Sequence, residues 1–234
     1  MNPGTSRARL AALLPARRRD LEDRGFVLLI DVGATFHISP RDLTHFATMG
    51  STYLRAALGV AFPRVGPLNI GEEATKGDGA LREAHPILLR MKDLRFVGNI
   101  EGKDIPRGGT DVVFCDGFTG SVSLKMYEGG AATAIDLRRD ASRAGVVWRL
   151  GIGLLRPALP LLARKTDFAE HGGAPILGFR RRLVKAHGRS HARAIRSALL
   201  VTDEALRNDL IGRITGEISQ VNETFFQATA GASC

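Results

Sequence analysis

Short apolar runs that are typical of buried strands alternate with longer stretches of helical character along most of this chain. One helix start is well marked, because Ser39 followed by Pro40 combines an N-cap residue with proline at the first helical position. A late helical stretch covers residues 192–227, and we expect a division near Gly212 or Gly216. The expected strands are residues 26–32, 64–70, 95–100, 111–115 and 183–187. This alternation predicts an α/β fold.

Clusters of glycine and small polar residues recur where a strand is followed by the next element. The clusters are DVGAT (31–35), NIGEEATKG (69–77), GNIEGKD (98–104), CDGFTGS (115–121) and AHGRS (186–190). Because ligands bind at the carboxyl ends of strands in open α/β sheets, we expect these five loops to line one crevice. Ser121 and Ser190 are each expected at a helix N-terminus, where unpaired N–H groups favour an anion. The alternative is that both serines only cap their helices.

The charge balance is basic, with 33 Lys and Arg against 24 Asp and Glu and a formal net charge of +9. The resulting pI of about 10.3 suits an acidic partner: nucleic acid, an anionic membrane surface, a phosphate-rich substrate or an acidic protein. The two cysteines, Cys115 and Cys234, provide neither a disulfide framework nor a thiolate metal site. No histidine has the spacing of a metal ligand, so no metal is assigned, and a reducing cytoplasm fits the chain.

The longest apolar tract spans residues 145–163, but its arginines and prolines make it a poor membrane-spanning helix. If residues 138–165 are helical, then Arg138, Arg149 and Arg156 fall within a sector of about 20°. A basic face beside a bulky apolar face is typical of a helix that lies on an anionic membrane, and the prolines indicate two helices meeting at a tip. The expected membrane contacts are Trp148, Leu154, Leu155, Arg149 and Arg156. The alternative is a helical hairpin at a dimer interface.

Several of these segments carry a resemblance to a known family. LLIDVGAT, PRVGPLNIGEEATKG, FVGNIEGKDIP, TDVVFCDGFTGSVSLKMYEG, FAEHGGAPILG and AHGRSHARAI occur in this order. Together they resemble the phosphate acyltransferases that form acyl-phosphate from acyl-acyl carrier protein for phospholipid synthesis. The family usually has asparagine where Thr35 and Ser121 stand. Its members also carry an additional segment, about a third of their length, before the part seen here, so we expect a truncated gene, a fragment or a misassigned start.

The resemblance implies a three-layer α/β/α sandwich similar to isocitrate and isopropylmalate dehydrogenases and to phosphotransacetylase. The whole chain, residues 1–234, would then be one catalytic-type domain with residues 138–165 projecting from it. The implied protein is a cytoplasmic homodimer, peripheral on the inner face of the membrane. Its partners are acyl-acyl carrier protein, inorganic phosphate and a membrane glycerol-3-phosphate acyltransferase that receives the product.

The chemistry that the resemblance implies uses no metal and no nicotinamide, because phosphate itself attacks the thioester. Lys76 supplies charge for phosphate and Asn69 supplies a neutral donor. Glu72 or Glu73 orients Lys76 or a neighbouring donor, and His187 contacts phosphate or the thioester. The other implied substrate contacts are Asn99, Glu101, Asp104, Asp116, Gly117, Ser121, Lys125 and Ser190. In the alternative interpretation the glutamates and Lys76 form an exposed ion pair, and His187 is a structural histidine at a strand end.

Two further functions stand beside acyl transfer. One is an inactive remnant that keeps only dimerisation or membrane docking, suggested by the shorter N-terminus. The other is a nucleic-acid-binding protein, suggested by the pI and by RRRLVKAHGRSHAR. Only 6% of the residues are aromatic and no binding module is recognisable, so nucleic acid is not expected as a partner.

Overall fold

The structure is a computed structural model that describes residues 4–5, 8–17, 25–143, 145–155, 174–186 and 190–230. The strands are β1 (Arg9–Pro15), β2 (Phe26–Ile30), β3 (Arg64–Asn69), β4 (Arg95–Phe96), β5 (Ile100–Glu101), β6 (Val112–Phe114), β7 (Ala174–Leu177) and β8 (Leu183–Lys185). The helices are α1 (Pro40–Leu58), α2 (Gly79–Arg90), α3 (Gly117–Arg143), α4 (Val146–Leu155), α6 (Ala192–Arg207) and α7 (Leu210–Ala230), with a short 3-10 helix at Gly102–Asp104.

The strands form one mixed sheet in the order β4-β3-β6-β2-β1-β7-β8, with β5 also paired to β3. Strands β2, β3, β4, β5 and β6 are parallel to one another. β1 is antiparallel to β2, β7 is antiparallel to β1, and β8 is antiparallel to β7. The parallel half therefore has all its carboxyl ends at one edge of the sheet.

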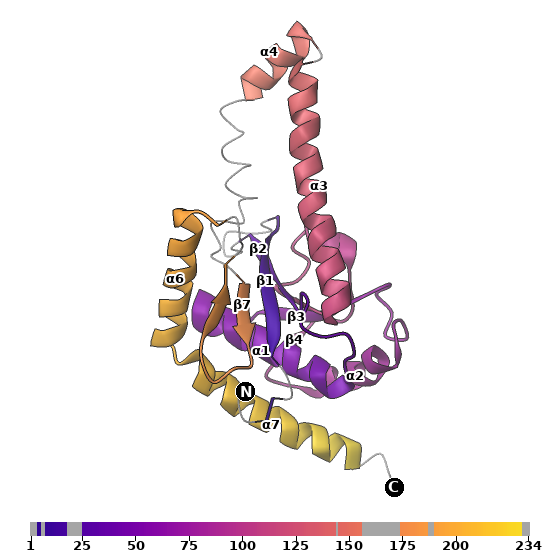
Figure 1. Cartoon of the computed structure of the whole chain (residues 1–234). Coiled ribbons are helices and arrows are strands. Elements are labelled where there is room, and N and C mark those ends of the chain that lie inside the picture. Colours follow the sequence, from indigo (N-terminus) through magenta and orange to yellow (C-terminus); the bar gives the residue numbers. More distant parts are fainter. Residues whose placement is uncertain are drawn as a thin grey trace.

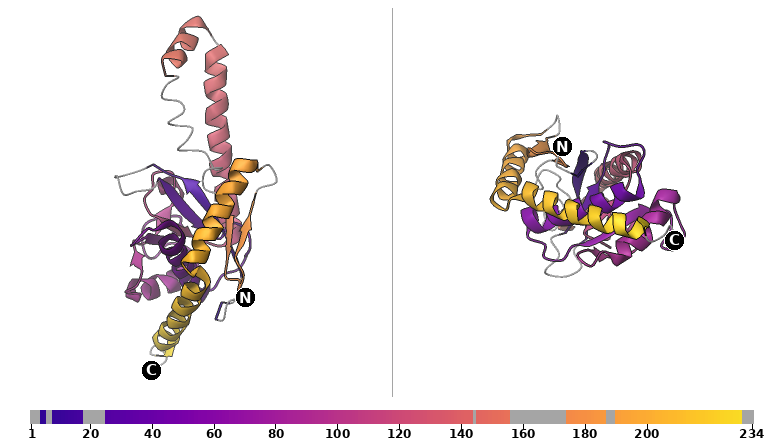
Figure 2. Two further views of the ribbon diagram at one scale, coloured as in Figure 1. Left: turned by 90° about the vertical axis from the view of Figure 1, so that its left-hand side faces the viewer. Right: turned by 90° about the horizontal axis from the view of Figure 1, so that it is seen from below.

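The two faces of the sheet pack against different helices. In β2, Leu28 and Ile30 belong to the core beneath α1, α2, α6 and α7, whereas Val27 and Leu29 belong to the core beneath α3. All these side chains are fully buried, as the period-2 alternation of a strand covered on both faces requires. Figure 2 shows α6 and α7 running along one side of the molecule. The expected three-layer α/β/α arrangement is confirmed.

Helix α1 begins as predicted from the sequence. The Ser39 hydroxyl caps the helix by accepting the N–H of Asp42 at 3.2 Å, and the Asp42 carboxylate accepts the N–H of Ser39 at 3.0 Å. Pro40 is the first residue of the helix. The helix is anchored to β1 because Arg9, 1% exposed, pairs with Asp42 at 2.7 Å and stacks 4.3 Å over the ring of Phe46.

Other elements differ from the expectation. The runs that become β1 and β7 were not expected as strands. The expected strand 95–100 is two short strands, because Gly98 adopts a φ of +86° between them. The late helical stretch divides at Asp209, whose φ is +45°, and not at Gly212 or Gly216.

The outer part of α3 and helix α4 form an arm that projects away from the sheet (Figure 1). Because α3 ends at Arg143 and a new helix starts at Val146, Arg138 and Arg149 do not share one helical phase. The expected single basic sector is therefore wrong. Helices α3 and α4 meet at one tip of the arm, and the prolines, where a tip was expected, lie outside the described residues together with Arg156. No helix in the described part of the chain is long and apolar enough to cross a membrane.

Candidate functional site

An open cleft of about 520 Å³ lies where β2, β3 and β6 give way to the elements that follow them. This volume is within the range of about 300–1,000 Å³ found for ligand pockets. Its position agrees with the rule that ligands bind at the carboxyl ends of parallel strands. The cleft is lined by Phe36, His37, Ile38, Asp78, Asp116, Phe118 and Thr119.

One wall of the cleft is the first turn of α3. Asp116 caps this helix, since its carboxylate accepts the N–H of Thr119 at 2.9 Å and the Thr119 hydroxyl at 2.5 Å. The N–H of Gly117 is bonded to the hydroxyl of Thr35 at 3.2 Å. Ser121 lies one turn inside α3, so the expectation that it stands at the helix N-terminus is wrong. The protein's own side chains occupy the helix start that was expected to hold an anion.

The other wall follows the loop after β2, and a buried carboxylate shapes this loop. Asp31 accepts hydrogen bonds from the backbone N–H groups of Leu10 (3.1 Å), Gly33 (3.2 Å) and Ala34 (3.1 Å). It also accepts the Thr35 hydroxyl at 2.9 Å. Since Thr35 in turn holds the N-terminus of α3, one carboxylate fixes both walls. Thr35, where the family usually has asparagine, faces the protein interior and is 2% exposed.

Two glycines allow this close approach of α3 to the loop. A Cβ at Gly117 would lie 2.6 Å from the carbonyl oxygen of Thr35, and one at Gly120 would lie 1.9 Å from that of Asp31. Both distances are far inside van der Waals contact. The sequence DGFTG therefore provides the helix cap and the two positions without a side chain that this packing needs.

The loop NIGEEATKG is held by two asparagine side chains. Asn69 donates to the carbonyl of Lys76 at 3.0 Å and accepts the N–H of Ile70 at 2.8 Å. Asn99 donates to the carbonyl of Glu73 at 2.7 Å. Both asparagines are buried, whereas Lys76 is exposed. The loop thus presents Lys76 on a braced backbone two residues before Asp78 of the cleft.

The glutamates of this loop do not orient Lys76 by an ion pair. Among the described residues Lys76 has no carboxylate partner, and Glu72 instead pairs with Lys103 at 3.8 Å. Lys103 also pairs with Glu101, and the hydrogen bond to Glu101 raises the pKa of Lys103. The carboxylates of Glu72, Glu101 and Asp104 come within 4.8 Å of one another, but the cation among them is already Lys103.

Most of the expected site residues lie at one edge of the sheet, but not all of them do. Four of the five glycine-containing loops lie at one edge of the sheet, where the residues brought together are Asn69, Glu72, Glu73, Lys76, Asn99, Glu101, Asp104, Asp116 and Gly117. Lys125 is on α3 and exposed. β8 runs opposite to β2, so Ser190, which follows it, lies at the other edge. The expectation that all five loops share one crevice is wrong for this loop, and His187 lies outside the described residues.

Sequence reasoning missed several residues of the cleft. Phe36, His37 and Phe118 are exposed beside it, and Asp78 caps α2 by accepting the N–H of Leu81 at 2.9 Å. An available signal was that Phe118 interrupts the otherwise polar, glycine-containing stretch DGFTGS.

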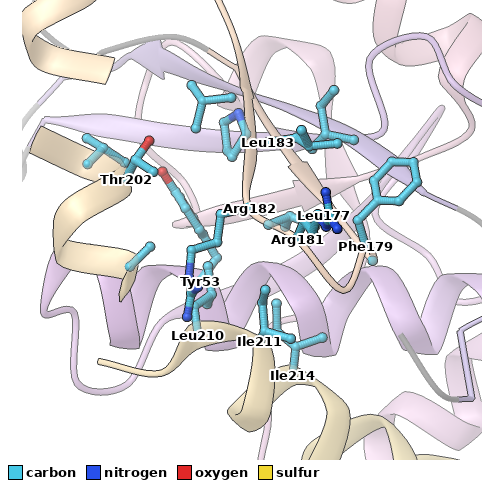
Figure 3. Close-up of a pocket in the computed structure, with 16 residues that line it drawn as sticks. Tyr53, Leu177, Phe179, Arg181, Arg182, Leu183, Thr202, Leu210, Ile211 and Ile214 are labelled. Carbon is cyan, nitrogen blue, oxygen red and sulfur yellow. The ribbon is translucent and has the colours of Figure 1, made fainter. Parts of the chain in front are cut away.

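A second, narrow cavity of about 30 Å³ lies between the β7–β8 hairpin and helices α1, α6 and α7 (Figure 3). It has room for water but not for an acyl or phosphate group. Within the described part of the chain, the Tyr53 hydroxyl and the Arg182 Nε are buried without hydrogen-bond partners there. Burial raises the pKa of Tyr53.

Comparisons with known proteins identify the family. The family described as "Fatty acid synthesis protein" matches residues 2–213. A phosphate acyltransferase of Clostridium perfringens is 38% identical over 217 residues, which are 93% of this chain and 62% of that protein. One of Myxococcus xanthus is 48% identical over 199 residues, covering 84% of this chain and 55% of that protein. This chain thus spans less than two thirds of the length of these two relatives.

A solved structure supports the fold. The EutD phosphotransacetylase from Staphylococcus aureus superposes with a TM-score of 0.53 at 13% identity, covering 86% of this chain and 55% of that one. The likeness confirms the expected phosphotransacetylase-like architecture. With its sequence matches over most of its length, the chain belongs to the family of fatty acid synthesis proteins and is similar to phosphate acyltransferases.

Proposed function

We propose that this chain contributes the cleft in which a fatty acyl group passes from acyl-acyl carrier protein to inorganic phosphate. A phosphate oxygen attacks the thioester carbonyl carbon, the C–S bond breaks, and the carrier thiolate leaves as acyl-phosphate forms. The reaction needs cations and N–H donors that hold phosphate against the carbonyl. The observation that carries the proposal is the braced loop after β3, which presents the exposed Lys76 at the edge where the cleft lies.

In this proposal Lys76 holds phosphate, and Asn69 and Asn99 position the loop that carries it. Asn69 already donates to the Lys76 carbonyl. Its amide group carries a second N–H, which can face the substrate. Bracing matters because a cation assists a transition state only if it is already in place when charge develops.

Replacing Lys76 with Met tests the role of the charge. We expect kcat/KM for acyl-phosphate formation, trapped with hydroxylamine, to fall by about 30-fold or more, which is ~2 kcal/mol of lost transition-state stabilisation. Lys92→Met is the matched control, because Lys92 is also exposed and lies beyond the far end of α2. Equal kinetics for the two variants would leave Lys76 as a surface residue.

We also propose that the arm docks on anionic membranes while the rest of the chain stays in the cytoplasm. On α4, Val147, Trp148 and Leu150 are exposed and Leu154 is 85% exposed. Exposed apolar side chains on a helix in a basic protein favour the membrane interface. The side chains of Arg149 and Leu155, which were expected to share this contact, lie outside the described part.

Sedimentation with vesicles tests membrane docking. Leu154→Glu should abolish binding to vesicles that contain anionic lipid, whereas Leu206→Glu, an exposed leucine on α6, should not. High salt should release the wild-type chain only in part, because apolar contact persists when charge is screened. If Leu154→Glu instead converts a dimer to a monomer and the wild type ignores vesicles, the arm is a dimer interface.

A further inference from the structure

Two exposed phenylalanines flank the cleft. Phe36, on the loop after β2, is 74% exposed, and Phe118, in the first turn of α3, is 61% exposed. The side chains between them are mainly polar, since the cleft also contains His37, Asp78 and Asp116. Large apolar side chains at the mouth of a polar cleft fit a ligand that has both a polar and an apolar part.

The apolar surface of Phe118 continues along α3. Gly120, Leu124 and Tyr127 lie on the face of α3 that packs against the sheet. At 100° per residue, residues 118, 122 and 126 lie on the opposite face, on successive turns, over about 12 Å. Val122 is exposed there and Met126 is 72% exposed. The four side chains Phe36, Phe118, Val122 and Met126 are called the apolar track below.

The start of this track has a fixed position. Phe118 follows Gly117, whose N–H is bonded to Thr35, and precedes Thr119, which is bonded to Asp116. A rigid apolar contact at a cleft loses little conformational entropy when it binds a ligand. Met126, at the outer end, has an unbranched and adaptable side chain that can follow a flexible chain.

We propose that the apolar track binds the alkyl chain of the acyl donor. Phe36 and Phe118 contact the carbons nearest the reacting carbonyl, and Val122 and Met126 contact carbons further along. The inference rests on the proposed acyl transfer, and it names the residues that set the preference for chain length. An alkyl chain is the occupant because the relatives are named for transfer of an acyl group, and because the track is continuous with the cleft.

Alkyl phosphates test the track without requiring turnover. Butyl, octyl and dodecyl phosphate, each below its micelle concentration, are titrated into the chain by calorimetry. A fully buried methylene strengthens binding about fourfold, so a half-covered chain should gain about twofold per methylene. Phe118→Ala combined with Met126→Ala should remove most of this dependence on chain length. Phe62→Ala is the matched control, because Phe62 is 78% exposed and does not line the cleft.

Each outcome decides the proposal. Affinity that rises with chain length in the wild type and in Phe62→Ala but not in the double variant supports it. Affinity independent of chain length, absence of binding, or an unchanged dependence in the double variant overturns it. If the double variant keeps the dependence and changes oligomeric state in sedimentation velocity, this face of α3 is a subunit interface and the proposal fails. Hydroxylamine-trapped product from the wild type would show that the proposed acyl transfer survives such a failure.

Discussion

The hydroxyl of Thr35 joins the two walls of the cleft, and removing it tests this arrangement. Thr35→Val keeps the shape of the side chain but loses the bond to the buried Asp31 carboxylate (2.9 Å) and the acceptor for the Gly117 N–H (3.2 Å). A hydrogen bond to a charged group contributes about 1.5–3 kcal/mol, and a buried N–H left without a partner costs about 1–3 kcal/mol. We therefore expect the free energy of unfolding to fall by about 3–5 kcal/mol.

Thr35→Ser is the control, because it keeps both hydrogen bonds and loses one methyl group, worth about 1 kcal/mol. Urea unfolding should be followed by far-UV circular dichroism, since Trp148 lies on the exposed arm and reports poorly on the core. The expected result is that the valine variant is less stable than the serine variant by about 2 kcal/mol or more. A difference under about 1 kcal/mol would refute the idea that this hydroxyl holds α3 to the loop.

Three further predictions follow from packing, titration and charge. Gly120→Ala should shift or unfold α3, because its Cβ would lie 1.9 Å from the Asp31 carbonyl, whereas Gly129→Ala, in open space on the same helix, should leave the melting temperature equal or higher. Burial lowers the pKa of His45 below 6.5. The stability that its neutral form contributes is therefore complete above pH 6.5 and decreases as the pH falls below it. Between pH 7.5 and pH 5.5 the melting temperature should fall more for the wild type than for His45→Gln. Stopped-flow association with acyl carrier protein, which is acidic, should slow steeply as salt rises if the basic charge of the chain steers it; a salt-independent rate would exclude this role.

Local signals in the sequence were sufficient for much of the parallel half of the sheet. Ser39 and Pro40 mark the start of α1 through bonds within one turn, which any copy of that tetrapeptide can make. The buried strands β2, β3 and β6 were found because continuous apolar runs are typical of strands covered on both faces. Parallel pairing then places the loops after these strands at one edge without further information.

What could not be predicted depends on contacts between distant residues. The position of the loop after β8 depends on three successive antiparallel pairings, one of them with β1, which was not expected as a strand. The partner of Glu72 is Lys103, 31 positions away, while the nearer Lys76 bonds to Asn69 only through its backbone. Sequence spacing alone favours the near pair of Glu72 and Lys76, because the spacing carries no information about how the loop turns.

The cleft has little positive charge of its own, although the chain carries a net charge of +9. Its two aspartates, Asp78 and Asp116, each accept a backbone N–H at a helix start. Their negative charge therefore offsets the helix dipoles of α2 and α3, which would otherwise attract an anion. The proposed binding of phosphate therefore requires a cation from a neighbouring loop.

Between the two lysines of the loops 69–77 and 98–104, only one is available for that role. Lys103 is already paired with Glu101 and Glu72, so drawing it to phosphate would break two existing contacts. Lys76 has no carboxylate partner in the described part of the chain. A single flexible lysine is a weak catalyst, because its side-chain entropy must be lost at each turnover. The buried amides of Asn69 and Asn99 leave that side-chain entropy unchanged, but they fix the backbone from which Lys76 extends, so in the proposed reaction only the side chain of Lys76 has to be ordered when phosphate binds.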